Sequence, residues 1–295
     1  MVDSAKEVPM KQVLLILLTV MIVIAVALPG WVVPTSMAKE EVAFFEDEAI
    51  PLGDLNLFEA NAFGLTSKWL EGVTLHALGA DALNPGFTGQ TRSQIEAVVG
   101  SPLTVYANTT ISALNNKTRG YYAQGDDVLL VYYDNKKQGT ALFTLQFNAE
   151  VARQTRFMTQ PVYDNESLVQ MTSDTVVLLN GVRQSYQRKP LKASKPLSAV
   201  AIKHSEDMVK NNYFSHTNSK GLGPKARIQG AKISFKAFGE ALTAGSYTPV
   251  EALTAWLNSD GHRPIVLGDY NTAGLGIATG QTTYGIYYTL KVIRQ

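Results

Sequence analysis

Three of the four histidines in this 295-residue sequence lie in its final third, where a glutamate also follows a glycine. These residues are His204, His216, Glu240 and His262. A neutral imidazole can bind a metal ion or exchange a proton near neutral pH, and a carboxylate can support either chemistry. Two imidazoles can hold Zn²⁺ and leave coordination positions open for water or a substrate. The last third of the chain is therefore the place to look for a functional site.

Glu240 has three candidate roles in such a site. It could be a third metal ligand, a partner that orients an imidazole, or a base that acts on a bound water. Two histidines are fewer than the three protein ligands of most catalytic zinc sites, so we expect any Zn²⁺ to bind modestly. For His216 and His262 the alternative is a polar network that ties loops to a sheet. We interpret His204, on the apolar face of a predicted helix, as a packed, hydrogen-bonded core residue.

The sequence gives little support for a serine or cysteine nucleophile. Ser205 and Ser215 each stand beside a histidine, but neighbours in sequence do not face each other on a helix or a strand. The chain contains no cysteine, which excludes cysteine nucleophiles, thiolate metal ligands and disulfides. We expect no organic cofactor, and we expect stability to come from packed cores.

An apolar segment near the N-terminus predicts export. Residues 13–28 carry no charge, Lys11 precedes them directly, and the next charged residue is Lys39. Residues 1–38 are expected to be a signal peptide cleaved after Ala38 or a retained signal anchor, since the apolar run approaches the roughly 20 residues that span a bilayer. Lysines before the run and acidic residues after it place the rest of the chain outside. We expect an extracellular protein, secreted or anchored to the outer face of the cytoplasmic membrane, whose membrane contact is this segment alone.

Composition and charge indicate a globular chain of two domains. Apolar residues make up 45% and charged residues 17%, and the formal net charge of +1 argues against nucleic acid as a partner. We predict a lead-in at residues 39–64, a smaller mixed α/β domain at residues 65–165 and an α+β domain at residues 175–295. The boundary is placed near residue 170, in the polar stretch 161–173.

In the first domain the sequence predicts a short capped helix followed by a hairpin. Thr91 or Ser93 is the candidate N-cap, and Gly100 ends the helix before Pro102. The runs 127–133 and 141–147 are rich in Val, Leu, Tyr and Phe, with a polar turn between them at residues 134–139. Tyr121 and Tyr122 are assigned to a preceding strand.

In the second domain we predict three helices and a terminal hairpin. The first helix starts at Thr175, and the third starts at an N-cap, Thr248, with Pro249 and Glu251 in its first turn. Strands are expected at residues 275–279 and 286–292, joined by a turn at residues 280–283. Apolar spacing predicts the buried faces of the second and third helices, which are Leu197, Val200, Ala201, His204 and Met208, and Val250, Leu253, Trp256 and Leu257.

Four motifs in this domain occur in a specific order. They are His204-Ser205-Glu206-Asp207-Met208, Tyr213-Phe214-Ser215-His216, Gly239-Glu240, and Trp256-Leu257-Asn258-Ser259-Asp260-Gly261-His262-Arg263. In order and spacing, residues 175–295 resemble the CAP superfamily, in particular its cysteine-free bacterial branch. Residues 65–165 are similar to the domain that often precedes the CAP module in such bacterial proteins. The resemblance implies an α-β-α sandwich with a central antiparallel sheet and a cleft lined by two histidines and acidic residues.

The resemblance assigns His216, Glu240 and His262 to that cleft, and it identifies two departures. The family's usual Gly-Glu-Asn ends here in Ala241, so any hydrogen bond made by that asparagine is lost. The second acidic residue of animal members falls on Ser259, and the adjacent Asp260 is expected to point elsewhere. A full set of two acids and two histidines is therefore not expected.

These observations favour a binding module over an enzyme. We expect the cleft to hold a lipid or another cell-envelope ligand, with a divalent metal such as Zn²⁺ as a candidate occupant. The alternative is a metal-assisted hydrolase or peptidase in which His216 and His262 hold the ion and Glu240 activates water. A third hypothesis is a structural role in the envelope, with the first domain as the adhesive part.

Overall fold

The computed structural model describes residues 73–77, 86–153 and 163–295. The predicted export segment at residues 1–38 and the lead-in at residues 39–64 lie outside these residues. Within the described part, no helix has the length and apolar character needed to cross a bilayer.

The N-terminal domain is built on a four-stranded antiparallel sheet with the order β1-β6-β5-β4. Its strands and helices have the following bounds: β1 Val73–Ala77, α2 Arg92–Val99, β2 Val105–Tyr106, β3 Thr109–Thr110, η4 Ser112–Leu114, β4 Arg119–Gln124, β5 Asp127–Asp134, β6 Thr140–Phe147 and α3 Ala149–Arg153. The predicted hairpin is β5–β6, and the two tyrosines assigned to a preceding strand lie in β4, so both predictions are confirmed.

The helix α2 also begins and ends where its sequence predicted. Thr91 is the N-cap: its hydroxyl accepts a hydrogen bond from the Gln94 backbone N–H, and the Gln94 side chain accepts one from the Thr91 N–H. Gly100 ends the helix with φ of 84°, a left-handed conformation that glycine adopts at little cost. Of the two candidate caps, the structure therefore selects Thr91 over Ser93.

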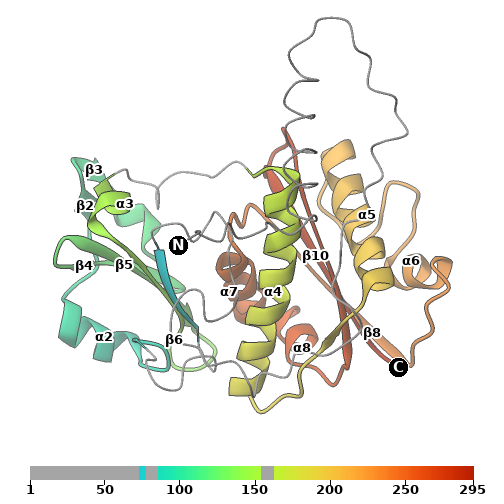
Figure 1. Cartoon of the computed structure of the whole chain (residues 1–295), viewed down its shortest axis with the longest axis horizontal. Coiled ribbons are helices and arrows are strands. Elements are labelled where there is room, and N and C mark those ends of the chain that lie inside the picture. Colours follow the sequence, from blue (N-terminus) through green and yellow to red (C-terminus); the bar gives the residue numbers. More distant parts are fainter. Residues whose placement is uncertain (1–72, 78–85, 154–162) are drawn as a thin grey trace, which may run out of the picture. The chain divides into compact units, whose positions relative to one another are not determined.

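The C-terminal domain is an α-β-α sandwich around a second four-stranded sheet (Figure 1). Its strand order is β7-β9-β10-β8, in which the short β7 runs parallel to β9 and the other pairs are antiparallel. Helices α5 and α6 lie on one side of this sheet, and α4, α7 and α8 lie on the other. The bounds are α4 Asn165–Ser185, β7 Lys192–Ala193, α5 Lys195–Asn211, α6 Pro224–Gly230, β8 Ala237–Ala244, α7 Pro249–Asn258, α8 Arg263–Val266, β9 Thr272–Thr279 and β10 Ile286–Arg294.

The predicted buried faces of α5 and α7 are confirmed, since all nine residues named for them are buried. Thr248 caps α7 as expected, because its hydroxyl accepts a hydrogen bond from the Glu251 N–H at 3.3 Å. The Glu251 carboxylate reaches one residue further back than in a standard capping box and accepts a hydrogen bond from the Tyr247 N–H at 2.7 Å. Local capping chemistry and apolar spacing thus define these helices without long-range information.

Two sequence predictions for this domain need correction. Helix α4 begins at Asn165 rather than at Thr175, so most of the polar stretch assigned to the domain boundary is helical. Its N-cap is Asp164, whose carboxylate accepts a hydrogen bond from the Ser167 N–H, and polar side chains conceal the helical period of its first turns. Strand β8 and the helices α6 and α8 were not predicted. Strand β8 is rich in Ala and Gly, residues with low strand propensity, and it is recognised only through its pairing with β10.

Helix α5 packs closely on β9 because that strand presents two glycines to it. A Cβ atom added to Gly274 would lie 2.3 Å from the Leu197 carbonyl carbon, and one added to Gly276 would lie 2.2 Å from the Ile202 backbone nitrogen. Both contacts are shorter than real Cβ contacts, so the backbones of α5 and β9 approach each other only where no side chain intervenes. This close approach fixes the N-terminal half of α5 on the sheet, and the loop carrying His216 departs from the other end of the same helix.

We predict that Gly276→Ala destabilises the protein by about 3 kcal/mol, because the new methyl group meets backbone atoms that cannot rotate away. Gly230→Ala is the matched control: a Cβ at Gly230 would have no atom within 4 Å. Urea denaturation of both variants measures the difference. A Gly276→Ala variant as stable as Gly230→Ala would contradict the close packing of α5 on β9.

Candidate functional site

A buried pair of opposite charges lies at the centre of the candidate site. Glu240 on β8 and Lys291 on β10 are directly opposite each other in the sheet register, so their side chains share one face. The Lys291 ammonium donates to Glu240 Oε2. The exposed fraction of the side chain is 0% for Lys291 and 2% for Glu240. A charge this deeply buried is tolerated only with a close partner of opposite sign.

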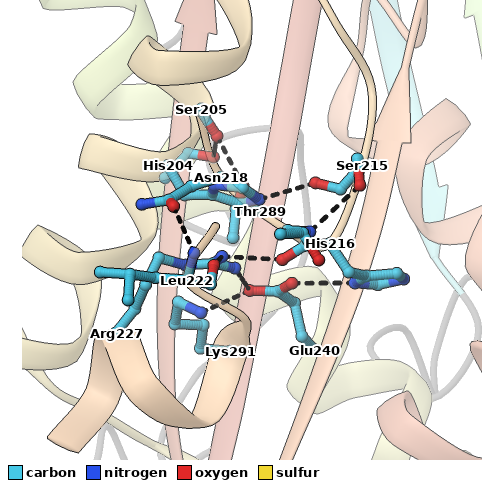
Figure 2. A network of polar contacts seen from close by, with 12 residues as sticks. His204, Ser205, Ser215, His216, Asn218, Leu222, Arg227, Glu240, Thr289 and Lys291 are labelled. Atoms are coloured by element: carbon cyan, nitrogen blue, oxygen red, sulfur yellow. Dashed lines mark hydrogen bonds and ion pairs between the residues drawn. The ribbon is translucent and has the colours of Figure 1, made fainter. Parts of the chain in front are cut away.

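Arg227 on α6 completes the charge balance and ties the neighbouring loop to the sheet. Its Nη2 donates to Glu240 Oε2 at 2.7 Å, and its Nη1 donates to the backbone carbonyls of His216 and Leu222 at 2.7 and 2.6 Å. One guanidinium therefore binds both the strand and the loop between α5 and α6 (Figure 2). Helix α6 thereby fixes the position of the His216 backbone.

The third partner of Glu240 is His216. Its Nδ1 lies 2.8 Å from Glu240 Oε1, while half of the imidazole side chain remains exposed. An ionised carboxylate can only accept, so His216 Nδ1 carries the proton in this contact. In the neutral ring, Nε2 is then an acceptor that stays available to a ligand. Of the three roles that the sequence left open for Glu240, these contacts favour the one of orienting an imidazole.

The electrostatics of the network keep Glu240 ionised. Burial alone would raise the pKa of Glu240, but the hydrogen bond with His216 and the positive charges of Lys291 and Arg227 outweigh it and lower the pKa to about 2. A carboxylate that binds its proton this weakly, with both oxygens engaged, is a poor general base near neutral pH. The same occupancy leaves it little capacity to ligate a metal.

His262 reaches the same site from the other side of strand β8. The ring centroids of His216 and His262 are 6.3 Å apart, with an angle of 59° between the ring planes. Among the described residues, neither ring nitrogen of His262 forms a hydrogen bond. Burial, and then the nearby His216, lower the pKa of His262, so this ring is neutral near pH 7. The structure thus brings His216, Glu240 and His262 together, as their motifs had implied.

A cavity with a volume of about 290 Å³ lies beside His262. Its walls come from the loop after α5, the C-terminal end of β8, helix α7 and the turn before β10. The lining residues are Phe214, Leu242, Thr243, Ala244, Ala255, Trp256, Ser259, His262 and Tyr284. None of these residues is an acid, a lysine or an arginine, so the site combines two imidazoles with an uncharged, largely apolar wall.

The remaining histidine and serine candidates have structural roles. His204 is buried, and its Nε2 lies 3.0 Å from the Ser215 carbonyl oxygen, as expected for a packed residue. Burial, with a smaller contribution from the charge of Arg227, lowers the pKa of His204 to about 4. Ser205 Oγ lies 2.8 Å from Thr289 Oγ1, and Ser215 Oγ accepts a hydrogen bond from the Thr217 N–H. Neither serine hydroxyl contacts an imidazole.

The positions where the sequence departs from the family pattern are also clear. Ala241 is fully buried in the core, where its methyl group needs no polar partner. Ser259 ends α7, accepts a hydrogen bond from the His262 N–H at 3.3 Å and lines the cavity. Helix α7 ends at Asn258, before Asp260, and the Asp260 carboxylate pairs with Lys136 instead of lining the cavity. The position at which the resemblance implies a second acid thus carries the uncharged hydroxyl of Ser259.

Two residues of this site were missed from the sequence. Lys291 had a usable signal, because it stands in the middle of an otherwise apolar strand and must either be exposed or find an anion. Arg227 had none, since it lies in a short polar helix where an arginine is ordinary. A search for charged residues inside predicted core strands would have found Lys291 but not Arg227.

The residues present fit a tightly bound metal poorly. Within the described ranges, no group of three or more His, Cys, Asp or Glu side chains is arranged to hold an ion. The nearest carboxylate, Glu240, is engaged with an ammonium, a guanidinium and an imidazole. Two imidazoles alone fall short of the three protein ligands typical of catalytic zinc sites.

Similarity to known proteins agrees with this architecture. Residues 176–292 match the sequence profile of CAP, the cysteine-rich secretory protein family. The match covers less than half of the chain, and it shows that these residues are similar to that family. The matched range does not include residues 65–165, so the resemblance stated for that region remains a prediction.

Individual relatives are similar to part of this chain. It is 34% identical to the Bacillus subtilis membrane protein YlbC over 130 residues, which are 43% of this chain and 36% of YlbC. It is 37% identical to YkwD of the same organism over 102 residues, which are 34% of this chain and 40% of YkwD. The chain thus spans well under two thirds of either relative.

A solved structure shares the fold over a longer range. It is an extracellular protein containing an SCP domain from Bacillus anthracis, with a TM-score of 0.62 and 22% identity. The likeness covers 76% of this chain and 78% of that one, so it extends beyond residues 176–292. It confirms the predicted α+β fold class with antiparallel sheets.

We predict that Glu240 contributes stability that disappears in acid. Its folded-state pKa of about 2 is below the ordinary 4.5, so the contribution is present above pH 4.5 and is lost as the pH falls toward 2. The shift corresponds to about 3 kcal/mol. In urea denaturation between pH 7 and pH 2.5, Glu240→Gln is expected to be less stable at pH 7 and to lose less stability in acid than the parent.

The control is Glu206→Gln, which removes an exposed carboxylate on α5. It should keep the pH dependence of the parent protein. Equal pH dependence in the parent and Glu240→Gln would show that the carboxylate is not held as described.

Proposed function

We propose that this protein is an extracellular CAP-domain binding module that holds a lipid or another cell-envelope ligand in the cleft between His216 and His262. The observation that carries this proposal is the engagement of Glu240 by three cationic or donor groups. It leaves a cleft with two imidazoles open to hydrogen bonding and an uncharged wall, and with no activated nucleophile among the described residues. Such a cleft is suited to holding a ligand.

The proposed location rests on the N-terminal segment and on the relatives. Residues 1–38 have the composition of a signal peptide or a signal anchor. YlbC is described as a membrane protein, and the Bacillus anthracis structure as an extracellular protein. We infer that the CAP domain faces the outside, either released after Ala38 or held at the membrane by that segment. Residues 65–165 are proposed to be the domain that accompanies CAP modules in bacteria.

Metal binding is a secondary proposal. His216 Nε2 and a nitrogen of His262 would hold the ion, and Glu240 would orient the first ring from behind. A bound Zn²⁺ would supply a Lewis acid at the cleft. The short donor set argues for weak occupancy.

The hydrolase alternative is less well supported. It requires Glu240 to take a proton from water, whereas its low pKa and its three partners oppose that step. Ser205 and Ser215 cannot replace it, because neither hydroxyl contacts a histidine.

The binding proposal is tested with the full-length chain in lipid nanodiscs, screened against lipid vesicles and solubilised cell-wall fragments. We expect His262→Ala to weaken binding of the selected ligand at least tenfold, because it removes an unshared hydrogen-bonding group from the cleft. Lys203→Ala, an exposed change on the outer face of α5, should bind like the parent. Undiminished binding by His262→Ala would contradict the assignment of the cleft.

Intact-mass and metal analysis of the native exported protein tests the proposals of metal binding and of cleavage after Ala38. Because the donor set is short, we expect less than stoichiometric Zn²⁺, and we expect added Zn²⁺ to bind at least tenfold more weakly to His216→Ala. Stoichiometric zinc that is lost in His216→Ala would instead establish a genuine metal centre. The mass itself reports whether cleavage follows Ala38.

A further inference from the structure

The cavity beside His262 has features that restrict what it can hold. Two of its lining rings, Phe214 and Tyr284, each leave 43% of their surface exposed, and their centroids are 5.8 Å apart at an angle of 58°. Exposing large aromatic side chains to water is unfavourable in free energy, and a ligand that covers them removes this exposure. Behind them, Leu242 and Trp256 are buried and form the inner wall. The cavity therefore has an aromatic mouth and an apolar interior.

The volume of the cavity suits a small apolar group better than a large one. A dry apolar cavity of about 150 Å³ can bind one benzene molecule, whereas pockets for drug-sized ligands start near 300 Å³. At about 290 Å³, this cavity has room for one phenol or indole ring with its first substituents. The tails of a two-chain lipid need much more space than this.

The polar groups of the cavity suit an uncharged ring better than a sugar ring or a charged group. Among the lining residues, polar side-chain groups come from Thr243, Trp256, Ser259, His262 and Tyr284, and the Thr243 hydroxyl is already within 3.1 Å of Ser246 Oγ. A hexose would bury several hydroxyls with few partners, and each unpaired polar group would cost about 1–3 kcal/mol. A charged side chain would find no counter-ion in this wall.

The ring that enters must belong to a larger molecule that remains outside. The mouth opens beside the two imidazoles, where His262 has both ring nitrogens unshared within the described part of the chain and His216 offers Nε2. These groups can bond to an amide next to the inserted ring. A peptide has this combination of an uncharged aromatic side chain and flanking backbone amides.

We propose that this cavity is a recognition pocket for one aromatic side chain of a peptide ligand, whose neighbouring backbone bonds to His262 and His216. This inference rests on the proposed function and narrows its ligand to a peptide or a peptide-bearing envelope component. Aromatic rings pack on Phe214 and Tyr284 in tilted geometry, as those two rings already do with each other.

The probe for this proposal is N-acetyl-4-fluorophenylalanine amide, observed by ¹⁹F NMR with the full-length chain in nanodiscs. We expect a dissociation constant on the order of 1 mM or lower, given the size of the probe. Unlabelled N-acetyl amides of Phe, Tyr and Trp should displace it, and those of Lys and Glu should be at least tenfold weaker. Charged amides that compete equally would overturn the proposal.

Two variants and a control locate the binding. Ala255→Phe introduces a ring from an exposed position of α7 into the cavity and should weaken binding at least tenfold without disturbing the core. Phe214→Ala should also weaken it, by removing one wall. Val98→Ala changes an equally apolar side chain on α2, 70% exposed and outside the cavity, and should have no effect. Circular dichroism confirms that each variant is folded.

The outcomes separate this inference from the proposed function. If vesicles or sugar fragments bind in a manner blocked by Ala255→Phe while the amides do not bind, the peptide pocket is refuted and the binding cleft stands. If neither Ala255→Phe nor His262→Ala alters the binding of any ligand found, the cleft is not the binding site and both proposals fail.

Discussion

The ionised carboxylate of Glu240, buried beneath the cleft, is the charge on which the candidate site depends. It is stabilised by an ammonium and a guanidinium, and it in turn holds an imidazole. Removing one member of such a group leaves an unpaired buried charge, which commonly costs several kcal/mol. The arrangement is therefore cooperative: strand, helix and loop are each placed by a bond to the same carboxylate.

Because Glu240 needs these partners, the site forms only when the fold brings them within bonding distance. The register of β10 against β8 sets Lys291 opposite Glu240, and α6 brings Arg227 to both the strand and the loop. Gly239 contributes from the same strand, because a Cβ there would lie 2.9 Å from the Cδ1 atom of Ile265 in α8. The Gly-Glu motif thus combines a close helix contact with a buried anion.

The charge balance also decides the character of the cleft. With Glu240 bound to Lys291, Arg227 and His216, the cleft presents two imidazoles and an apolar wall, and Ser259 stands where an acid would add a negative charge. A wall without acidic, lysine or arginine side chains discriminates by size and by hydrogen bonding rather than by charge. It is a better match for an uncharged group than for a cation.

Short-range sequence patterns are sufficient to predict the locally encoded features. The caps at Thr91 and Thr248, the buried faces of α5 and α7, and the strands β5, β6, β9 and β10 follow from short-range spacing and turn chemistry. The motifs also indicated that His216, Glu240 and His262 belong together. The tertiary structure alone revealed strand β8, the partners of Glu240 and the cavity, because strand register and the burial of a charge depend on residues distant in the chain. A residue's type limits the bonds it can form, and only the fold decides which partner is within reach.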